Sequence, residues 1–123
     1  MSETRDDGRG WDLYVRDMIE FAEKVLSYTD GLDRKAFVAD GLTYDATLRN
    51  IQLIGEAATN IPAEVRESYP EIPWRAVVGV RNRLAHSYLH ISDVIVWSII
   101  QDAIPSMLPQ LHAILEDSRR ESP

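Results

Sequence analysis

The stretch TYDATLRNIQLIGEAATNI, residues 43–61, decides how this chain folds. Its apolar side chains recur at three- and four-residue steps and fall on two adjacent ridges of a helix: Ile51, Ile54 and Ala58 on the first, and Leu53, Ala57 and Ile61 on the second. Such a broad apolar face is suited to burial between neighbouring helices. Thr43 is the expected N-cap, and Glu56 lies next to the apolar face. The stretch therefore predicts a central helix of a bundle.

The sequence before this stretch has the same helical period. A first helix is expected to end at Asp30-Gly31. The apolar residues on one of its faces are Trp11, Tyr14, Val15, Met18, Ala22, Val25 and Leu26. A short helix is expected from about Asp33 to Ala39, with Asp33 as N-cap, before Asp40-Gly41 breaks the chain again.

Prolines divide the sequence after residue 61 into further helices. Pro62 can open a short helix that ends before Pro70, and Pro73 can open another that runs toward Tyr88. Ser92 is the expected N-cap of the last helix.

The last helix keeps its apolar period from Val96 to Leu115, with a kink expected at Pro105 and Pro109. No run alternates between apolar and polar residues in the manner of a β-strand. We therefore expect an all-α fold, an up-and-down bundle of four main helices plus short helices. The helical domain is expected at residues 11–115, between a flexible N-terminal segment, 1–10, and a polar, frayed C-terminal tail, 116–123.

Composition narrows the classes of function. At 123 residues the chain has room for one core, and its 45% apolar and 27% charged residues are typical of a globular domain. The net charge of -7 has the wrong sign for holding nucleic acid by bulk attraction, so any anion site must be local. The absence of cysteine excludes disulfides, thiol nucleophiles and cysteine-ligated zinc. With neither a signal peptide nor an apolar stretch long enough to span a bilayer, we expect a cytoplasmic protein without membrane association.

A local cationic patch lies between Glu71 and Asp93, where the sequence has no acidic residue. The patch contains three arginines and two histidines: Arg75, Arg81, Arg83, His86 and His90. It is the part of this acidic chain where a phosphate could bind, although a solvated helix face would have the same composition.

Helical geometry indicates which of these side chains could act together. At ~100° per residue, Asn82 and His86 project together one turn apart, and Arg81 and Tyr88 lie at the margin. The opposite side of the helix is apolar and can pack into the bundle: Val77, Val80 and Leu84. If the helix unwinds before His86, the pairing of Asn82 with His86 fails first.

Histidine and arginine are sufficient for cleaving RNA without a metal. His86 can give and take protons near neutral pH, and the Arg81 guanidinium can stabilise the charge that develops on phosphorus when the ribose 2′-hydroxyl attacks. The reaction needs a base at one oxygen and an acid at another. Two copies of His86 across a twofold axis would supply both, and His86 with His90 in one chain is the alternative. A zinc pair of His86 and His90 is rejected, because Ser87 stands where that motif carries its glutamate.

The segment Arg81-Asn82-Arg83-Leu84-Ala85-His86-Ser87-Tyr88 resembles the Arg-x4-His-x-Tyr motif of HepT-like toxins in the HEPN superfamily. Residues 54–58, 70–75 and 93–97 resemble the same family, in the expected order. The resemblance implies a HEPN-like homodimer whose paired motifs form a cleft, and a metal-independent endoribonuclease that needs no cofactor. It also implies a cognate minimal nucleotidyltransferase antitoxin in a type VII-like toxin–antitoxin system, which attaches AMP to the motif tyrosine, here Tyr88.

The sequence thus assigns roles to eight residues. We expect three to be catalytic: Arg81, His86 and Asn82. Four are expected to bind the RNA substrate: Arg83, Arg75, His90 and Glu56. Tyr88 is the expected site of modification. The alternative is a non-catalytic helical partner, or a substrate-binding subunit, of a nucleotidyltransferase.

Overall fold

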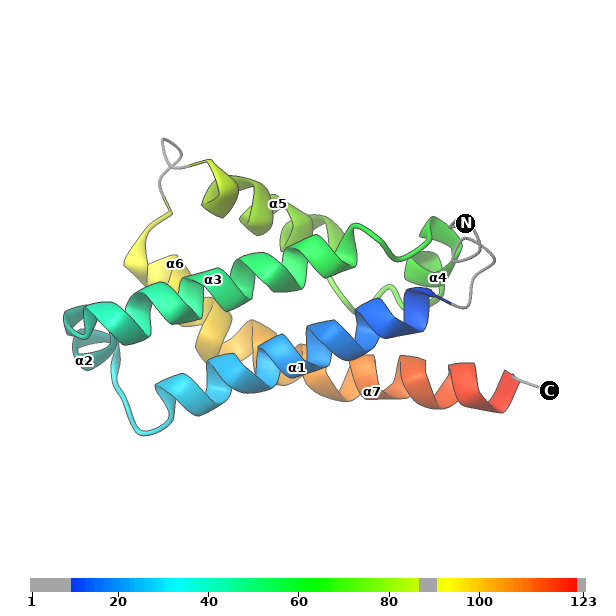
Figure 1. Cartoon of the computed structure of the whole chain (residues 1–123), viewed down its shortest axis with the longest axis horizontal. Helices are drawn as coiled ribbons and strands as arrows, with labels where there is room; N and C mark the ends of the chain where they lie inside the picture. The colour runs from blue at the N-terminus through cyan, green and yellow to red at the C-terminus, as the bar shows by residue number, and fades with distance from the viewer. Residues whose placement is uncertain (1–9, 87–90, 122–123) are drawn as a thin grey trace.

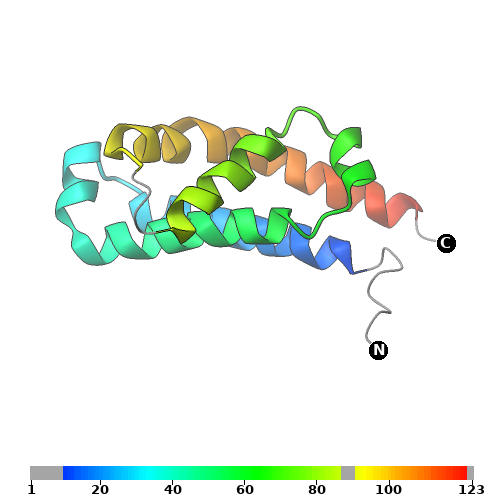
Figure 2. The ribbon, with the colours of Figure 1, turned by 90° about the horizontal axis from the view of Figure 1, so that it is seen from above.

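The computed structural model describes residues 10–86 and 91–121, and all regular structure in these ranges is helical. The elements follow one another in this order: α1 (Trp11–Thr29), α2 (Arg34–Ala39), α3 (Gly41–Ala58), α4 (Ala63–Ser68), α5 (Trp74–Ala85), α6 (Asp93–Ser98), the π-helical turn η2 (Ile99–Ala103) and α7 (Ile104–Glu121). The long helices α1, α3 and α7 lie side by side, and α5 runs obliquely over α3 (Figures 1 and 2). The all-α fold class is therefore confirmed.

The core lies between α1 and its neighbours α3 and α7. Its largest buried side chains include residues from each of these helices: Val15, Met18, Val25, Ile51, Ile54, Leu111 and Ile114. Helix α3 packs against α1 on one side and α5 on the other. Both of its ridges are used, since Ala57, Ala58 and Ile61 are also buried, while Leu53 is partly exposed. The broad apolar face predicted for this helix is thus confirmed.

Two expected caps are confirmed. The Asp33 carboxylate accepts a hydrogen bond from the Ala36 amide at 2.8 Å and begins α2. The Ser92 hydroxyl accepts one from the Ile95 amide at 3.2 Å and begins α6. In both cases a short polar side chain replaces a hydrogen-bond partner that the first turn of a helix lacks.

The expected cap of α3 was wrong. The helix begins at Gly41, and its N-cap is Asp40, whose carboxylate accepts a hydrogen bond from the Thr43 amide at 3.2 Å. Thr43 therefore lies within the first helical turn. Asp40 has the extended backbone usual for an N-cap, and its negative charge is also favoured at a helix N-terminus. A hydrogen bond then ties this end of α3 to α6: the Tyr44 hydroxyl donates to the Asp93 carboxylate at 2.7 Å. Burial, together with that bond, raises the pKa of Tyr44 to about 12.

The C-terminal helical run differs from the expectation in two ways. The distortion expected at the prolines takes the form of the π-helical turn η2, which ends two residues before Pro105, while Pro109 lies inside α7. Proline has no amide hydrogen, so regular hydrogen bonding is interrupted near it.

The second difference is at the end of the chain. Where a frayed tail was expected from residue 116, α7 continues to Glu121. Side-chain contacts stabilise this extension: Asp117 accepts a hydrogen bond from the Tyr69 hydroxyl at 2.6 Å, and Arg119 and Arg120 form ion pairs with Glu116 and Asp117. Residues 1–9 of the expected flexible N-terminal segment lie outside the described residues. In the described part of the chain, no helix has the length and apolar composition needed to span a membrane.

Candidate active site

Helix α5 carries most of the predicted site, and a glycine of α3 sets its position. A Cβ atom added at Gly55 would overlap Cβ of Arg81 and would lie 3.0 Å from the Val77 carbonyl oxygen. The missing side chain thus allows α5 to approach α3 closely at the point where Arg81 begins. This role of Gly55 was not predicted from the sequence, where the glycine stood out only as part of the family-like segment 54–58. The available signal was a glycine in the middle of a helix, which costs stability unless close packing requires it.

Two acceptors hold the guanidinium of Arg81. One terminal nitrogen lies 3.2 Å from a carboxylate oxygen of Glu56, and the other donates to the Asn82 side-chain oxygen at 2.7 Å. The side chains of Arg81 and Glu56 are 31% and 41% exposed, so the pair is accessible from solvent. The hydrogen bond from Arg81 is the main reason why the pKa of Glu56 lies below its usual value, and Gln52 and Arg49 lower it further. Arg81 is therefore oriented before any substrate binds.

His86 stands immediately after α5 and not within it. The helix ends at Ala85, and His86 is an exposed C-cap with extended backbone whose amide donates to the Arg83 carbonyl at 3.3 Å. The predicted continuation of the helix toward Tyr88 was wrong. The helical geometry that paired Asn82 with His86 ends before the histidine, and the Asn82 side-chain oxygen accepts from Arg81 instead. Leaving a helix in extended conformation requires no glycine, so the sequence carries no stop signal here.

The structure gathers some of the predicted residues and separates others. Glu56, Arg81 and Asn82 form one hydrogen-bonded set. Arg75 lines the same open groove as Asn82, whereas Arg83 lines a second groove that includes Ile91 and Ile95.

Two predicted site residues, Tyr88 and His90, lie outside the described residues. Among the residues that are described, no group of three histidine, aspartate or glutamate side chains is placed to bind a metal ion.

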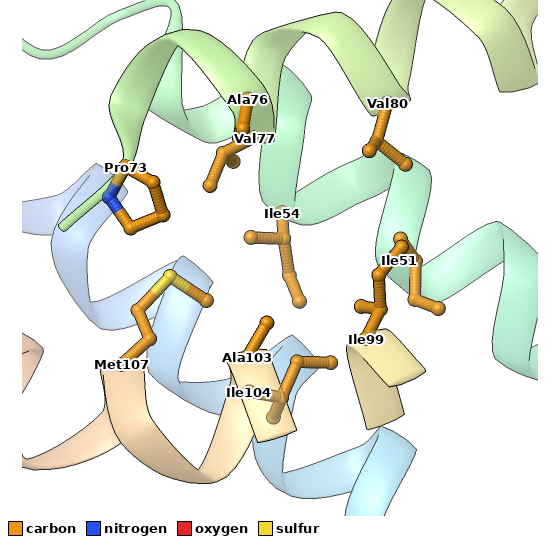
Figure 3. A pocket seen from close by; sticks show the side chains of 10 residues that line it. All are labelled: Ile51, Ile54, Pro73, Ala76, Val77, Val80, Ile99, Ala103, Ile104 and Met107. Atoms are coloured by element: carbon orange, nitrogen blue, oxygen red, sulfur yellow. The ribbon is translucent and has the colours of Figure 1, made fainter. Parts of the chain in front are cut away.

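The apolar side of α5 faces the bundle across a small cavity. The cavity has a volume of about 80 Å³ and separates α5 from η2 and α7 (Figure 3). Val77 and Val80 point into it, as predicted, and Ile51, Ile54 and Ile99 are among the residues opposite. Helix α5 is thus supported mainly by α3, and Trp74 is its one buried residue.

Comparison with known proteins identifies the family. The sequence profile described as ribonuclease HepT-like matches residues 18–114, a range that includes the whole of α3 and α5. The chain belongs to the ribonuclease HepT-like family. The resemblance found in the sequence is therefore confirmed, as is the HEPN-like helical fold.

Relatives of this HepT-like chain are distant in sequence but cover nearly the same length. A Thermococcus cleftensis protein named "Probable ribonuclease HepT" is 33% identical over 94 residues, which are 76% of this chain and 86% of the relative. A "Putative RNase" of Caldanaerobacter subterraneus subsp. tengcongensis is 30% identical over 86% of this chain and 95% of its own length. A "Putative RNase" of Methanocaldococcus jannaschii is 28% identical over 88% and 89%. No solved structure matches the chain.

Proposed function

We propose that this HepT-like protein is an endoribonuclease that cleaves RNA without a metal, with His86 transferring protons and Arg81 stabilising the reacting phosphate. The observation that carries the proposal is the arrangement at the end of α5. Glu56 and Asn82 hold the guanidinium of Arg81, and the exposed His86 follows five residues later, immediately after the end of the same helix. A fixed cation and a proton-transfer group are the two components that an RNA transesterification requires.

The chemistry follows from these two groups. The 2′-oxygen of a ribose forms a bond to the adjacent phosphorus, the bond from phosphorus to the 5′-oxygen of the next nucleotide breaks, and a cyclic phosphate remains. A neutral imidazole takes the proton of the 2′-hydroxyl, and an imidazolium returns a proton to the departing 5′-oxygen. The Arg81 guanidinium neutralises the negative charge that increases on the phosphate oxygens. DNA lacks the nucleophile and is not cleaved.

Homodimerisation supplies the two imidazoles that this scheme requires. Each chain contributes one His86, and a twofold axis would bring the His86 of a second chain to the other side of the scissile bond. An exposed apolar side chain near α5 supports this arrangement: Ile95 of α6 is 51% exposed and lines the same groove as Arg83. His86 with His90 of the same chain is the competing arrangement.

Single substitutions test the catalytic assignment. His86→Ala and Arg81→Ala should each lower the rate of RNA cleavage about 100-fold or more, because each removes a group that acts in the transition state. The measurement is cleavage of a labelled RNA in the presence of EDTA. An oligonucleotide with a single 2′-deoxy residue at the cleaved position is the control that must stay intact. Undiminished cleavage by His86→Ala would refute the assignment.

The same variants separate the competing schemes. We expect a mixed dimer with one wild-type and one His86→Ala subunit to be as inactive as the dimer in which both subunits carry His86→Ala, if both imidazoles act on one bond. Loss of activity from His90→Ala alone would instead favour acid and base in one chain.

We further propose that the protein is the toxin of a two-component system, with a cognate minimal nucleotidyltransferase that silences it by attaching AMP to Tyr88. The family membership and the position of Tyr88 two residues after His86 support this proposal. Such a protein acts on cytoplasmic RNA, so its expression should arrest growth and His86→Ala should relieve the arrest. If the protein were instead a non-catalytic partner of a nucleotidyltransferase, His86→Ala should not change its effect on growth. Mass spectrometry of Tyr88 and of a Tyr88→Phe variant, after co-expression with the neighbouring nucleotidyltransferase, tests the modification.

A further inference from the structure

An open groove of about 680 Å³ runs between α4 and α5, away from the end of α5 where His86 lies. Arg66 and Glu67 of α4 line one side, and Arg75, Gly79 and Asn82 of α5 line the other. Asn82 is the residue whose side chain accepts a hydrogen bond from Arg81. One end of the groove is therefore adjacent to the group that we assign to the reacting phosphate.

The two arginines of this groove have no anionic partner among the residues that the structure describes. Within residues 10–86 and 91–121, neither Arg66 nor Arg75 forms a side-chain hydrogen bond or an ion pair, and the buried Nε atom of Arg66 has no acceptor. Arg119 and Arg120 of α7, by contrast, each pair with a carboxylate one turn away. In a chain of net charge -7, unpaired guanidiniums that line a shared groove offer hydrogen bonds and charge to an external anion.

The shape of the groove suits an extended strand. Arg75, Gly79 and Asn82 are four and three residues apart, so they share one face of α5 and span about 10 Å along its axis. A Cβ atom at Gly79 would meet no other atom within 4 Å, which shows that the space above the middle of this face is open. The helix therefore offers room for an RNA backbone above Gly79, between Arg75 and Asn82.

We propose that the groove between α4 and α5 binds the sugar–phosphate backbone of single-stranded RNA on its way to the cleavage site, with Arg66 and Arg75 contacting phosphates. Arg66 lies outside the cationic patch between Glu71 and Asp93, so the sequence pattern did not single it out. The identity of the ligand rests on the proposed function. A guanidinium can form hydrogen bonds with two oxygens of one phosphate. The groove is lined by two arginines and one acidic residue, Glu67, so the net charge of its lining is positive.

RNA binding by cleavage-deficient protein tests this proposal. The background is His86→Ala, and the probe is a fluorescein-labelled single-stranded RNA of mixed sequence, about 16 nucleotides long. Arg66→Ala and Arg75→Ala should each weaken binding roughly three- to tenfold, and each should reduce the steepness of the salt dependence by about 0.7. Arg66→Lys, which keeps the charge and most of the side-chain packing, should retain more affinity than Arg66→Ala.

The matched control is Arg34→Ala. Arg34 is exposed on α2, at the other end of the molecule from α4 (Figure 1), and its loss should leave affinity unchanged. Unchanged affinity in both groove variants, or an equal loss in Arg34→Ala, would overturn the proposal. The proposal would also be overturned if Arg66→Ala and Arg75→Ala bound RNA normally but no longer formed a complex with the nucleotidyltransferase, because the groove would then bind a protein.

This proposal and the nuclease assignment can fail separately. If wild-type protein cleaves RNA and the groove variants bind it normally, the groove assignment is wrong and the nuclease stands. If the groove variants lose affinity but wild-type protein cleaves no RNA, the groove is an RNA-binding site and the nuclease assignment is wrong.

Discussion

The contact between Glu56 and Arg81 links the two helices of the site at the level of single side chains. It joins positions 25 residues apart in the sequence, across the interface between α3 and α5. Because both side chains are partly solvated, the contribution of such a pair to folding is small, about 0–1 kcal/mol. Its importance lies in where it places the guanidinium.

Replacing Glu56 by alanine should therefore cost less than about 1 kcal/mol of unfolding free energy at pH 7. The folded-state pKa of Glu56 is lowered, so the stability that this carboxylate contributes is present above its unfolded pKa and is lost as pH falls through the folded pKa. The difference between wild type and Glu56→Ala, measured by urea unfolding, should accordingly vanish in acid. A difference that grows as pH falls would contradict the assignment of Arg81 as the stabilising partner.

The same substitution should affect catalysis more than stability. Without Glu56, Arg81 keeps only the acceptor on its neighbour Asn82 and is held less firmly toward the phosphate, so we expect kcat to fall about tenfold while KM changes little. Glu56→Gln keeps an oxygen that accepts a hydrogen bond from Arg81, so it should restore part of the rate. Equal kcat values in Glu56→Ala and wild type would show that the ion pair does not position Arg81.

At the level of elements, the approach of α5 to α3 depends on Gly55. Local signals in the sequence mark where most helices begin: Asp33 and Ser92 cap two of them, and Pro62 and Pro73 precede two others. These signals act within one turn, which is why they could be predicted. The crossing of two helices is set by residues far apart in the chain, and no local pattern reports it.

Gly55→Ala and Gly79→Ala form a matched pair for testing this dependence. Alanine at position 55 would force α5 away from α3, because the Val77 carbonyl is rigid backbone, and should cost about 1–3 kcal/mol of stability. Alanine at position 79 enters open space inside a helix and should stabilise the fold by about 0.5–1 kcal/mol. Urea unfolding midpoints measure both. Shifts of the same sign and size would show that the close approach does not matter.

The end of α5 and the start of α3 show what sequence patterns leave open. Asp40 and Thr43 are both good N-cap residues, and the choice between them follows from where the chain leaves α2. His86 leaves the helix in a conformation that any residue can adopt. The residues of the site could therefore be named from the sequence, whereas the partners of Asn82 and the groove lined by Arg66 required the folded structure.

At the level of the whole molecule, the proposed RNA site is a local group of cations on an acidic protein. The net charge of -7 repels nucleic acid at long range, so the proposed association with RNA would depend on the groove and on the end of α5. Because few phosphates are contacted, the logarithm of the RNA affinity should fall only shallowly with the logarithm of the salt concentration, by about 0.7 per contact. A dimer would double the local positive charge where the two copies meet.

The proposed dimer predicts different outcomes for two exposed apolar residues. Ile95 is 51% exposed beside the groove of Arg83, and Leu13 is 59% exposed near the start of α1, at the other end of the molecule (Figure 1). Ile95→Asp should convert the dimer to a monomer and lower RNA cleavage, because it places an unpaired charge in the interface. Leu13→Asp should leave the dimer intact. Sedimentation velocity distinguishes the two outcomes, and a dimeric Ile95→Asp variant would move the interface elsewhere.

The cavity beneath α5 also makes the fold unevenly compressible. Hydrostatic pressure favours whichever state occupies less volume, and empty apolar space is the volume that a protein loses when it opens. The gap below Val77 and Val80 lies along the helix that carries Arg81. Compression should therefore loosen the contact between α5 and the residues below the cavity before it disturbs the packing of α1.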